Sequence, residues 1–136
     1  MRLVLDVENT ITKRDGKVHL DPFEPDNTLV QVGICNADKP NQLKIFNLDH
    51  NECKDETGSR RKQIQKCLDS TKLLIMHNAQ HDLMWLWECG FKYDGDIYDT
   101  MLAEYILDRG QRNPLSLQAC AERRQLEVQK DDTLKR

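Results

Sequence analysis

The chain has 136 residues, of which 38% are hydrophobic, and its formal net charge is −3. That length supports one hydrophobic core, so we expect a single domain over residues 1–136. The apolar stretches are far shorter than the roughly 20 residues of a membrane-spanning helix, which argues against a membrane partner, and the net charge argues against a generally basic coat for nucleic acid. No signal-peptide pattern opens the sequence, so we expect a cytoplasmic protein, in a bacterium or in a phage-infected host.

The cysteines predict free thiols. Their odd number and their spacing, without any C-x-x-C pair, fit neither a disulfide framework nor a zinc finger. We therefore expect a reducing compartment for all five: Cys35, Cys53, Cys67, Cys89 and Cys120.

The first half of the chain predicts three strands. Residues Arg2–Asn9 read as a strand with apolar residues on both faces, which is typical of a buried strand near the centre of a sheet. Residues 12–27 are polar, contain two prolines, and predict a loop. Further strands are expected at residues 28–35 and 42–48. Three successive strands joined by loops indicate an antiparallel meander.

The second half alternates between helices and strands. A helix is expected over Lys62–Asp69, then a strand over residues 72–77, and a helix over Ala79–Cys89 whose core-facing stripe includes Trp87. The remaining expected elements are a brief strand at residues 96–98, a helix at 100–107 capped by Asp99, and a helix at about 115–125. Strands first and then alternating elements predict an α/β fold with a mixed sheet flanked by helices.

Two carboxylates are the first candidates for chemistry. Asp6 and Glu8 are two residues apart on the first strand, so the period of two places both on one face. Like charges this close repel each other, and a divalent cation is the simplest compensation. The alternative is that the strand ends at Asp6 and both carboxylates are solvated.

A third carboxylate, Asp82, follows Asn78 by four residues at the junction between a strand and a helix. Asn78 is well placed to cap that helix, and Asp82 then lies in its first turn. There it either binds metal or stabilises the helix N-terminus through its charge.

Together these pieces resemble the DEDD superfamily of 3′-5′ exonucleases, which has an RNase H-like fold. The pattern is D-x-E on the first strand and, some seventy residues later, N-x-x-x-D at a strand-to-helix junction. The segment at residues 98–107, Tyr-Asp-Thr-Met-Leu-Ala-Glu-Tyr-Ile-Leu, is similar to the exonuclease domains of bacterial DNA polymerase I and of phage polymerases. The resemblance runs from Leu3 to about Arg124. By the same motifs, the sequence also resembles ribonuclease D.

The resemblance implies a site that binds two Mg²⁺ or Mn²⁺ ions. Asp6 would bridge them, Glu8 would hold one and Asp82 the other, and oxygen ligands of this kind suit hard cations that assist phosphoryl displacement. The implied partners are a single-stranded or frayed 3′ DNA end and a polymerase domain in the natural protein. Further substrate-binding candidates, on the same grounds, are Asn9, Thr10, Asn78 and His81.

The third motif of the family, Y-x-x-x-D or H-x-x-x-D, does not occur in the sequence. We therefore expect a domain truncated before that motif, with little activity of its own. Two other functions stay open, an RNA-trimming exonuclease of the ribonuclease D kind and a catalytically silent nucleic-acid-binding domain.

Overall fold

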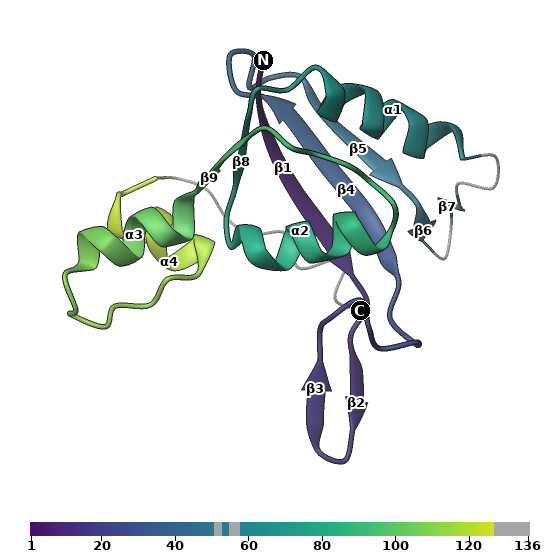
Figure 1. Cartoon of the computed structure of the whole chain (residues 1–136). Helices are drawn as coiled ribbons and strands as arrows, with labels where there is room; N and C mark the ends of the chain where they lie inside the picture. Colours follow the sequence, from purple (N-terminus) through teal and green to yellow (C-terminus); the bar gives the residue numbers. More distant parts are fainter. Residues whose placement is uncertain (51–52, 55–57, 127–136) are drawn as a thin grey trace.

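The computed structural model describes residues 1–50, 53–54 and 58–126. Its centre is a five-stranded sheet in the order β5-β4-β1-β8-β9 (Figure 1). The antiparallel part contains β1 (Arg2–Asn9), β4 (Leu29–Asn36) and β5 (Leu43–Asn47), and the strands added in parallel are β8 (Leu73–Met76) and β9 (Asp96–Asp99). The predicted mixed sheet with its three-stranded meander is confirmed.

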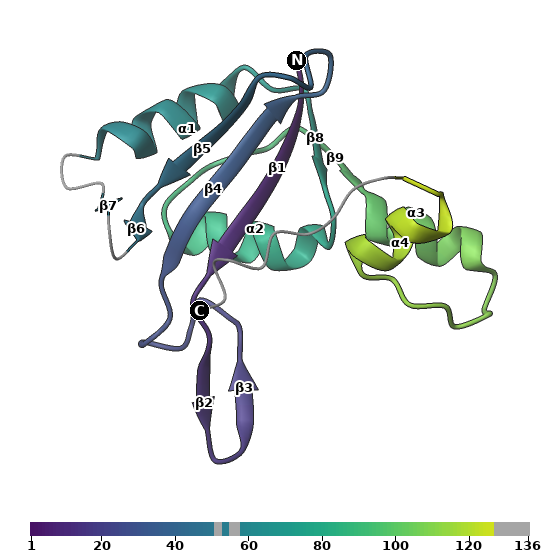
Figure 2. The ribbon, with the colours of Figure 1, turned by 180° about the vertical axis from the view of Figure 1, so that it is seen from behind.

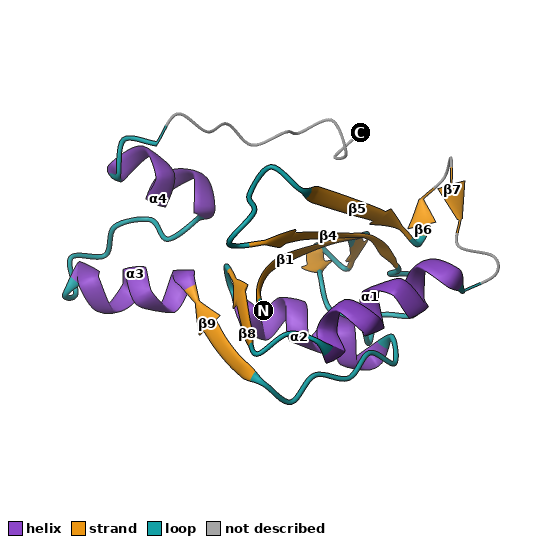
Figure 3. Ribbon diagram, turned by 90° about the horizontal axis from the view of Figure 1, so that it is seen from above, coloured by secondary structure: helices purple, strands orange, loops and turns teal. Residues whose placement is uncertain are grey.

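The helices of the described part are α1 (Ser59–Asp69), α2 (Ala79–Glu88), α3 (Thr100–Asp108) and α4 (Leu117–Arg123). Helices α1 and α2 lie on the same side of the sheet (Figure 3), whereas α3 and α4 lie beyond the edge formed by β9 (Figures 1 and 2). The largest differences from the predicted bounds are in α1 and α4, whereas the other predicted elements differ by at most one residue at either end. Helix α1 begins at Ser59 instead of Lys62, and α4 is shorter because Ser116 caps it by accepting a hydrogen bond from the Ala119 N–H.

Strand β1 is buried on one face only, which corrects the expectation of a strand covered on both sides. Leu3, Leu5 and Val7 are at most 5% exposed, whereas Val4 is 40% exposed. Asp6 and Glu8 share the exposed face with Val4. An antiparallel sheet tolerates one uncovered face, and here α1 and α2 cover only the other (Figure 3). Asp6 and Glu8 therefore lie on an accessible surface.

The two tryptophans of α2 differ in burial, and the expectation for Trp87 is not met. Trp85 is 2% exposed and belongs to the core, whereas Trp87 is 56% exposed, so the prediction for Trp87 is wrong. Trp85 donates a hydrogen bond from its indole N–H to the Leu20 carbonyl at 3.1 Å. The segment that ends at Leu20 thus contacts the side of α2 that holds Trp85, and no helical periodicity reveals that contact.

Residues 12–27 are not a plain loop as predicted. They contain a hairpin of β2 (Thr12–Arg14) and β3 (Lys17–His19), with a tight turn at Asp15 and Gly16, whose φ angles of 52° and 76° match turns of the Asp-Gly type. The hairpin projects from the carboxyl end of β1 (Figure 1). Asn27 fastens its base, since Asn27 Oδ1 accepts from Thr12 Oγ1 and Nδ2 donates to the carbonyl of residue 19.

Three smaller observations complete the fold. A second short hairpin pairs β6 (Asp49–His50) with β7 (Cys53–Lys54). Four cysteines are free thiols, as predicted, and the side chain of the fifth, Cys53, lies outside the described residues. Within the described ranges, no helix is both long and apolar enough to span a bilayer.

Candidate metal centre

The candidate site begins where two parallel strands stop pairing. Strand β8 pairs with β1 only over Arg2–Val4. On the other edge of β1, the Ala37 N–H donates a hydrogen bond to the Arg2 carbonyl. The even-numbered residues of β1 therefore form backbone hydrogen bonds to β4, and its odd-numbered residues direct their backbone N–H and C=O groups towards β8. The backbone of Val7 therefore faces an edge that β8 no longer occupies. Ligand sites of α/β sheets favour such carboxyl ends of strands.

Asp82, in the first turn of α2, occupies this open edge. Its side chain is buried, at 3% exposure, and its carboxylate accepts a hydrogen bond from the Val7 N–H. The Oδ2 atom is buried too and has no hydrogen-bond partner among the described atoms. Burial, followed by the charges of Asp6 and Glu8, raises the pKa of Asp82 from 3.8 to about 8. A buried carboxyl in this state is suited to receive either a proton or a cation.

Asp6 and Glu8 contribute charge from the neighbouring strand. They lie on the exposed face of β1, just before an irregularity in the β1–β4 register between Glu8 and Asn9. Such irregularities often re-aim side chains next to functional sites. Asp6 also acts on His81, where its charge partly offsets a lowering of the histidine pKa by burial. The described side chains nevertheless contain no group of three or more His, Cys, Asp or Glu arranged to hold a metal ion.

Asn9 and His81 form a polar contact beside these carboxylates. Asn9 Nδ2 donates to the carbonyls of Thr10 and Leu20, at 2.8 and 3.1 Å. Asn9 Oδ1 is therefore the acceptor for His81 Nε2, 3.0 Å away. The hydroxyl of Thr10 accepts from the Thr28 N–H at 2.7 Å. Of these candidates, Asn9 and His81 are joined directly, whereas Thr10 ties the chain after β1 to the start of β4.

Asn78 does not cap α2 with its side chain, which corrects that part of the prediction. It occupies the N-cap position in the left-handed conformation, at φ 64° and ψ 64°, a region that asparagine tolerates better than most residues. Asp99 supplies the missing acceptor, since its carboxylate accepts from the N–H groups of Asn78 and Ala79, each at 3.0 Å. The sequence carries no signal for this long-range cap.

Asp99 also caps α3, as predicted. Its Oδ1 atom accepts from the N–H groups of Met101 and Leu102, at 2.9 and 3.4 Å. Burial would by itself raise the pKa of Asp99, but the hydrogen bonds, that from Ala79 first, outweigh it and lower the pKa. One ionised carboxylate thus holds the first amides of two helices.

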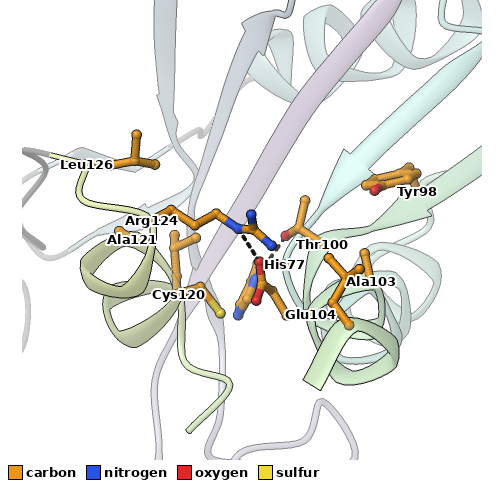
Figure 4. Close-up of a pocket in the computed structure, with 11 residues that line it drawn as sticks. His77, Tyr98, Thr100, Ala103, Glu104, Cys120, Ala121, Arg124 and Leu126 are labelled. Carbon is orange, nitrogen blue, oxygen red and sulfur yellow. Dashed lines mark hydrogen bonds and ion pairs between the residues drawn. The ribbon is translucent and has the colours of Figure 1, made fainter. Parts of the chain in front are cut away.

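A pocket of about 460 Å³ lies between α3 and α4, next to this junction (Figure 4). His77 lines it and contacts Thr100 Oγ1 through Nδ1 and the Leu115 carbonyl through Nε2. The carboxylate in the pocket, Glu104, forms ion pairs with Arg123 and Arg124. Because those guanidinium groups already neutralise it, this pocket is less suited to a metal ion than the surroundings of Asp82.

The residues around Asp82 fit a hard divalent cation in their chemistry. All three candidate ligands are carboxylates, and the partnerless Oδ2 atom of Asp82 gains a partner if a cation binds. Mg²⁺ characteristically uses one or two protein carboxylates and completes its coordination with water and substrate phosphate. The lack of a closed three-ligand group among the described residues is compatible with that mode of binding.

Comparison with known proteins gives structural matches only. No family model and no curated protein matches the sequence. Two solved structures of NrnC from Brucella melitensis, one of them with bound Mg²⁺, match with a TM-score of 0.62 at 18% sequence identity. The matches cover 96% of this chain but 55% and 57% of the NrnC chains, so the chain spans little more than half their length. The likeness shows the fold, and it confirms the expected α/β, RNase H-like architecture.

Proposed function

We propose that this chain carries the metal-binding core of a 3′-5′ exonuclease, which hydrolyses a terminal phosphodiester and releases a nucleoside 5′-monophosphate. The buried carboxyl of Asp82, with its partnerless oxygen beside the charges of Asp6 and Glu8, is the observation that carries the proposal. The fold shared with NrnC and the Mg²⁺ in one NrnC structure support it. They support the DEDD resemblance in general and give no support for a particular closeness to DNA polymerase I.

In this proposal each residue has a distinct task. Asp6, Glu8 and Asp82 hold Mg²⁺ or Mn²⁺, two ions in the complete site, and such ions stabilise the attacking and leaving oxygens of a phosphoryl displacement. Asn9 and His81, already hydrogen-bonded to each other, contact the 3′-terminal nucleotide, and Thr10 and Asn78 border the same region. Asp82 must be ionised to act as a ligand, so the site fills more readily as the pH approaches 8.

The substrate class has two candidates. The match to NrnC favours the ribonuclease D-like reading, an enzyme that trims RNA 3′ ends, over a proofreading domain joined to a DNA polymerase. The chemistry at Asp82 is the same for both. Recognition of the ribose 2′-hydroxyl separates them, because only RNA carries that group.

A catalytically silent nucleic-acid-binding domain is the candidate from another class. The 136 residues contain no Y-x-x-x-D or H-x-x-x-D motif, so a fourth carboxylate is not identified among them. For the same reason we expect slow cleavage by this chain alone.

The test combines metal binding with cleavage. Mn²⁺ is titrated against the wild type and Asp6→Ala by calorimetry, and 5′-labelled RNA and DNA oligonucleotides of one sequence are incubated with excess protein. We expect the wild type to bind Mn²⁺ at least about tenfold more tightly than Asp6→Ala and to shorten RNA from its 3′ end faster than DNA. Equal Mn²⁺ affinities would overturn the metal site. Tight Mn²⁺ binding without cleavage of either strand would overturn the enzymatic role and favour the silent domain.

A further inference from the structure

Asp99 joins two helices that begin at different strands. Strand β9, which ends at Asp99, pairs in parallel with β8, and Met76 lies opposite Asp99 in that register. The chain leaves β8 at Met76 and enters α2 only three residues later, whereas it enters α3 directly after Asp99. The two helix N-termini therefore start side by side at the end of neighbouring strands. Their unpaired first amides converge on one carboxylate.

The turn into α2 depends on an acceptor from outside the helix. Asn78 holds a left-handed conformation there, its side chain makes no capping hydrogen bond, and the first turn contains Asp82. The carboxylate of Asp99 instead accepts hydrogen bonds from the N–H groups of Asn78 and Ala79. Ala79 is followed after three residues by Asp82, within one helical turn. A shift at the beginning of α2 thus moves the Asp82 carboxyl directly.

We propose that Asp99 is a positioning residue: by holding the first amides of α2 against those of α3, it keeps the carboxyl of Asp82 at the open edge of β1. This inference rests on the proposed metal-dependent function. Asp99 does not itself contact metal or substrate. It acts through α2, as residues behind metal ligands commonly do, and loss of such a residue typically costs about 10–100-fold in metal affinity or activity.

Replacement of Asp99 by serine separates this role from ordinary capping. Serine is a good N-cap, so Asp99→Ser retains an acceptor for the Met101 and Leu102 N–H groups of α3. Its single short hydroxyl cannot at the same time accept hydrogen bonds from the N–H groups of Asn78 and Ala79. The matched control is Ser116→Ala, which removes the cap of α4, a helix whose first turn has no hydrogen bond to α2 among the described contacts.

The experiment compares wild type, Asp99→Ser and Ser116→Ala by two measurements. Mn²⁺ affinity is measured by calorimetry, and backbone hydrogen exchange of residues 79–82 is measured without metal. We expect Asp99→Ser to bind Mn²⁺ about tenfold more weakly and to exchange these amides about tenfold faster, and Ser116→Ala to match the wild type in both. Wild-type exchange in Asp99→Ser would overturn the positioning role. If the wild type binds no Mn²⁺ the proposed function fails, yet the exchange result still decides whether Asp99 holds α2.

If the chain cleaves an oligonucleotide, a kinetic measurement distinguishes a positioning role of Asp99 from a general loss of stability. A displaced first turn of α2 lowers kcat through Asp82 and raises KM through His81, which lies in the same turn, whereas Ser116→Ala should leave both constants unchanged. A lowered kcat in Ser116→Ala of the same size would show that loss of any helix cap suffices, and would contradict a specific role for Asp99.

Discussion

His81 donates a hydrogen bond from Nε2 to Oδ1 of Asn9 across 3.0 Å, and this contact ties the first turn of α2 to the last residue of β1. Burial lowers the pKa of His81, with partial compensation from Asp6, so the imidazole is neutral at pH 7. The neutral ring can donate from Nε2 in only one tautomer. A hydrogen bond between two uncharged side chains therefore joins β1 and α2, the two elements that carry the candidate ligands.

We predict that this pair is coupled in stability. His81→Phe retains an aromatic ring and loses the donor, and should cost about 1 kcal/mol. Asn9→Ala also removes the bonds to Thr10 and Leu20, so it should cost roughly 2–3 kcal/mol. Urea unfolding of both single variants and the double variant gives the coupling, expected at about 1 kcal/mol. Strictly additive effects would contradict a direct bond.

The raised pKa of Asp82 predicts an unusual pH dependence of stability. Between pH 3.8 and about 8 the folded carboxyl keeps its proton while the unfolded one loses it, so the folded state binds more protons and its stability falls as the pH rises. Each pH unit in that window costs up to about 1.4 kcal/mol. We expect Asp82→Asn to be more stable than the wild type at pH 7 without metal, by an amount on the order of a few kcal/mol.

Urea unfolding at several pH values in the presence of EDTA tests that sign. The difference between wild type and Asp82→Asn should shrink towards pH 4 and be largest near pH 8. A variant less stable than the wild type at pH 7 would instead assign Asp82 a structural role at the N-terminus of α2.

Binding of a metal ion should offset the loss of stability that the burial of Asp82 causes at neutral pH. We expect saturating Mg²⁺ to raise the melting temperature of the wild type by several degrees, since a ligand at a hundred times its Kd adds about 2.7 kcal/mol to the unfolding free energy. Asp6→Ala should show a much smaller shift. Scanning fluorimetry with Mg²⁺, and with an equal ionic strength of NaCl as control, separates specific binding from salt screening; equal shifts in the two proteins would count against the site.

The two tryptophans of α2 should differ sharply. Trp85→Ala removes a fully buried ring and should cost about 3–5 kcal/mol. Trp87→Ala, two residues away on the exposed side, should change stability by no more than about 0.5 kcal/mol. Urea unfolding measures both, and acrylamide quenching gives an independent control, because only Trp87 should be readily quenched. Comparable losses in the two variants would contradict the orientation of α2.

Local patterns predicted most of the fold. The apolar residues of Arg2–Asn9 and the apolar spacing of α2 predicted the right elements, because strands and helices are formed by residues close together in the sequence. The hairpin at residues 12–19 was missed because it has few apolar residues, although Asp15-Gly16 is a known turn pair and was available as a signal. The burial of Trp85 depends on Leu20, sixty-five positions away, and could not be read from the helix itself.

The candidate site divides in a similar way. The resemblance to the DEDD exonucleases implied that Asp6, Glu8 and Asp82 belong together, and the charges of Asp6 and Glu8 are among the causes that raise the pKa of Asp82. Whether they bind metal stays a prediction. The second task of Asp99 had no local signal, because its hydrogen bonds to Asn78 and Ala79 arise only once β9 is placed beside β8.

Because β8 pairs with β1 only over Arg2–Val4, the Val7 N–H donates its hydrogen bond to the side chain of Asp82. If the pairing continued further, a backbone carbonyl of the neighbouring strand would be the acceptor. We therefore expect the protection of the Val7 N–H from solvent exchange to follow the charge on Asp82. The carboxylate is a better acceptor than the protonated acid. The Val7 amide resonance thus provides a built-in reporter of ionisation at the centre of the site, readable in a spectrum without any substrate.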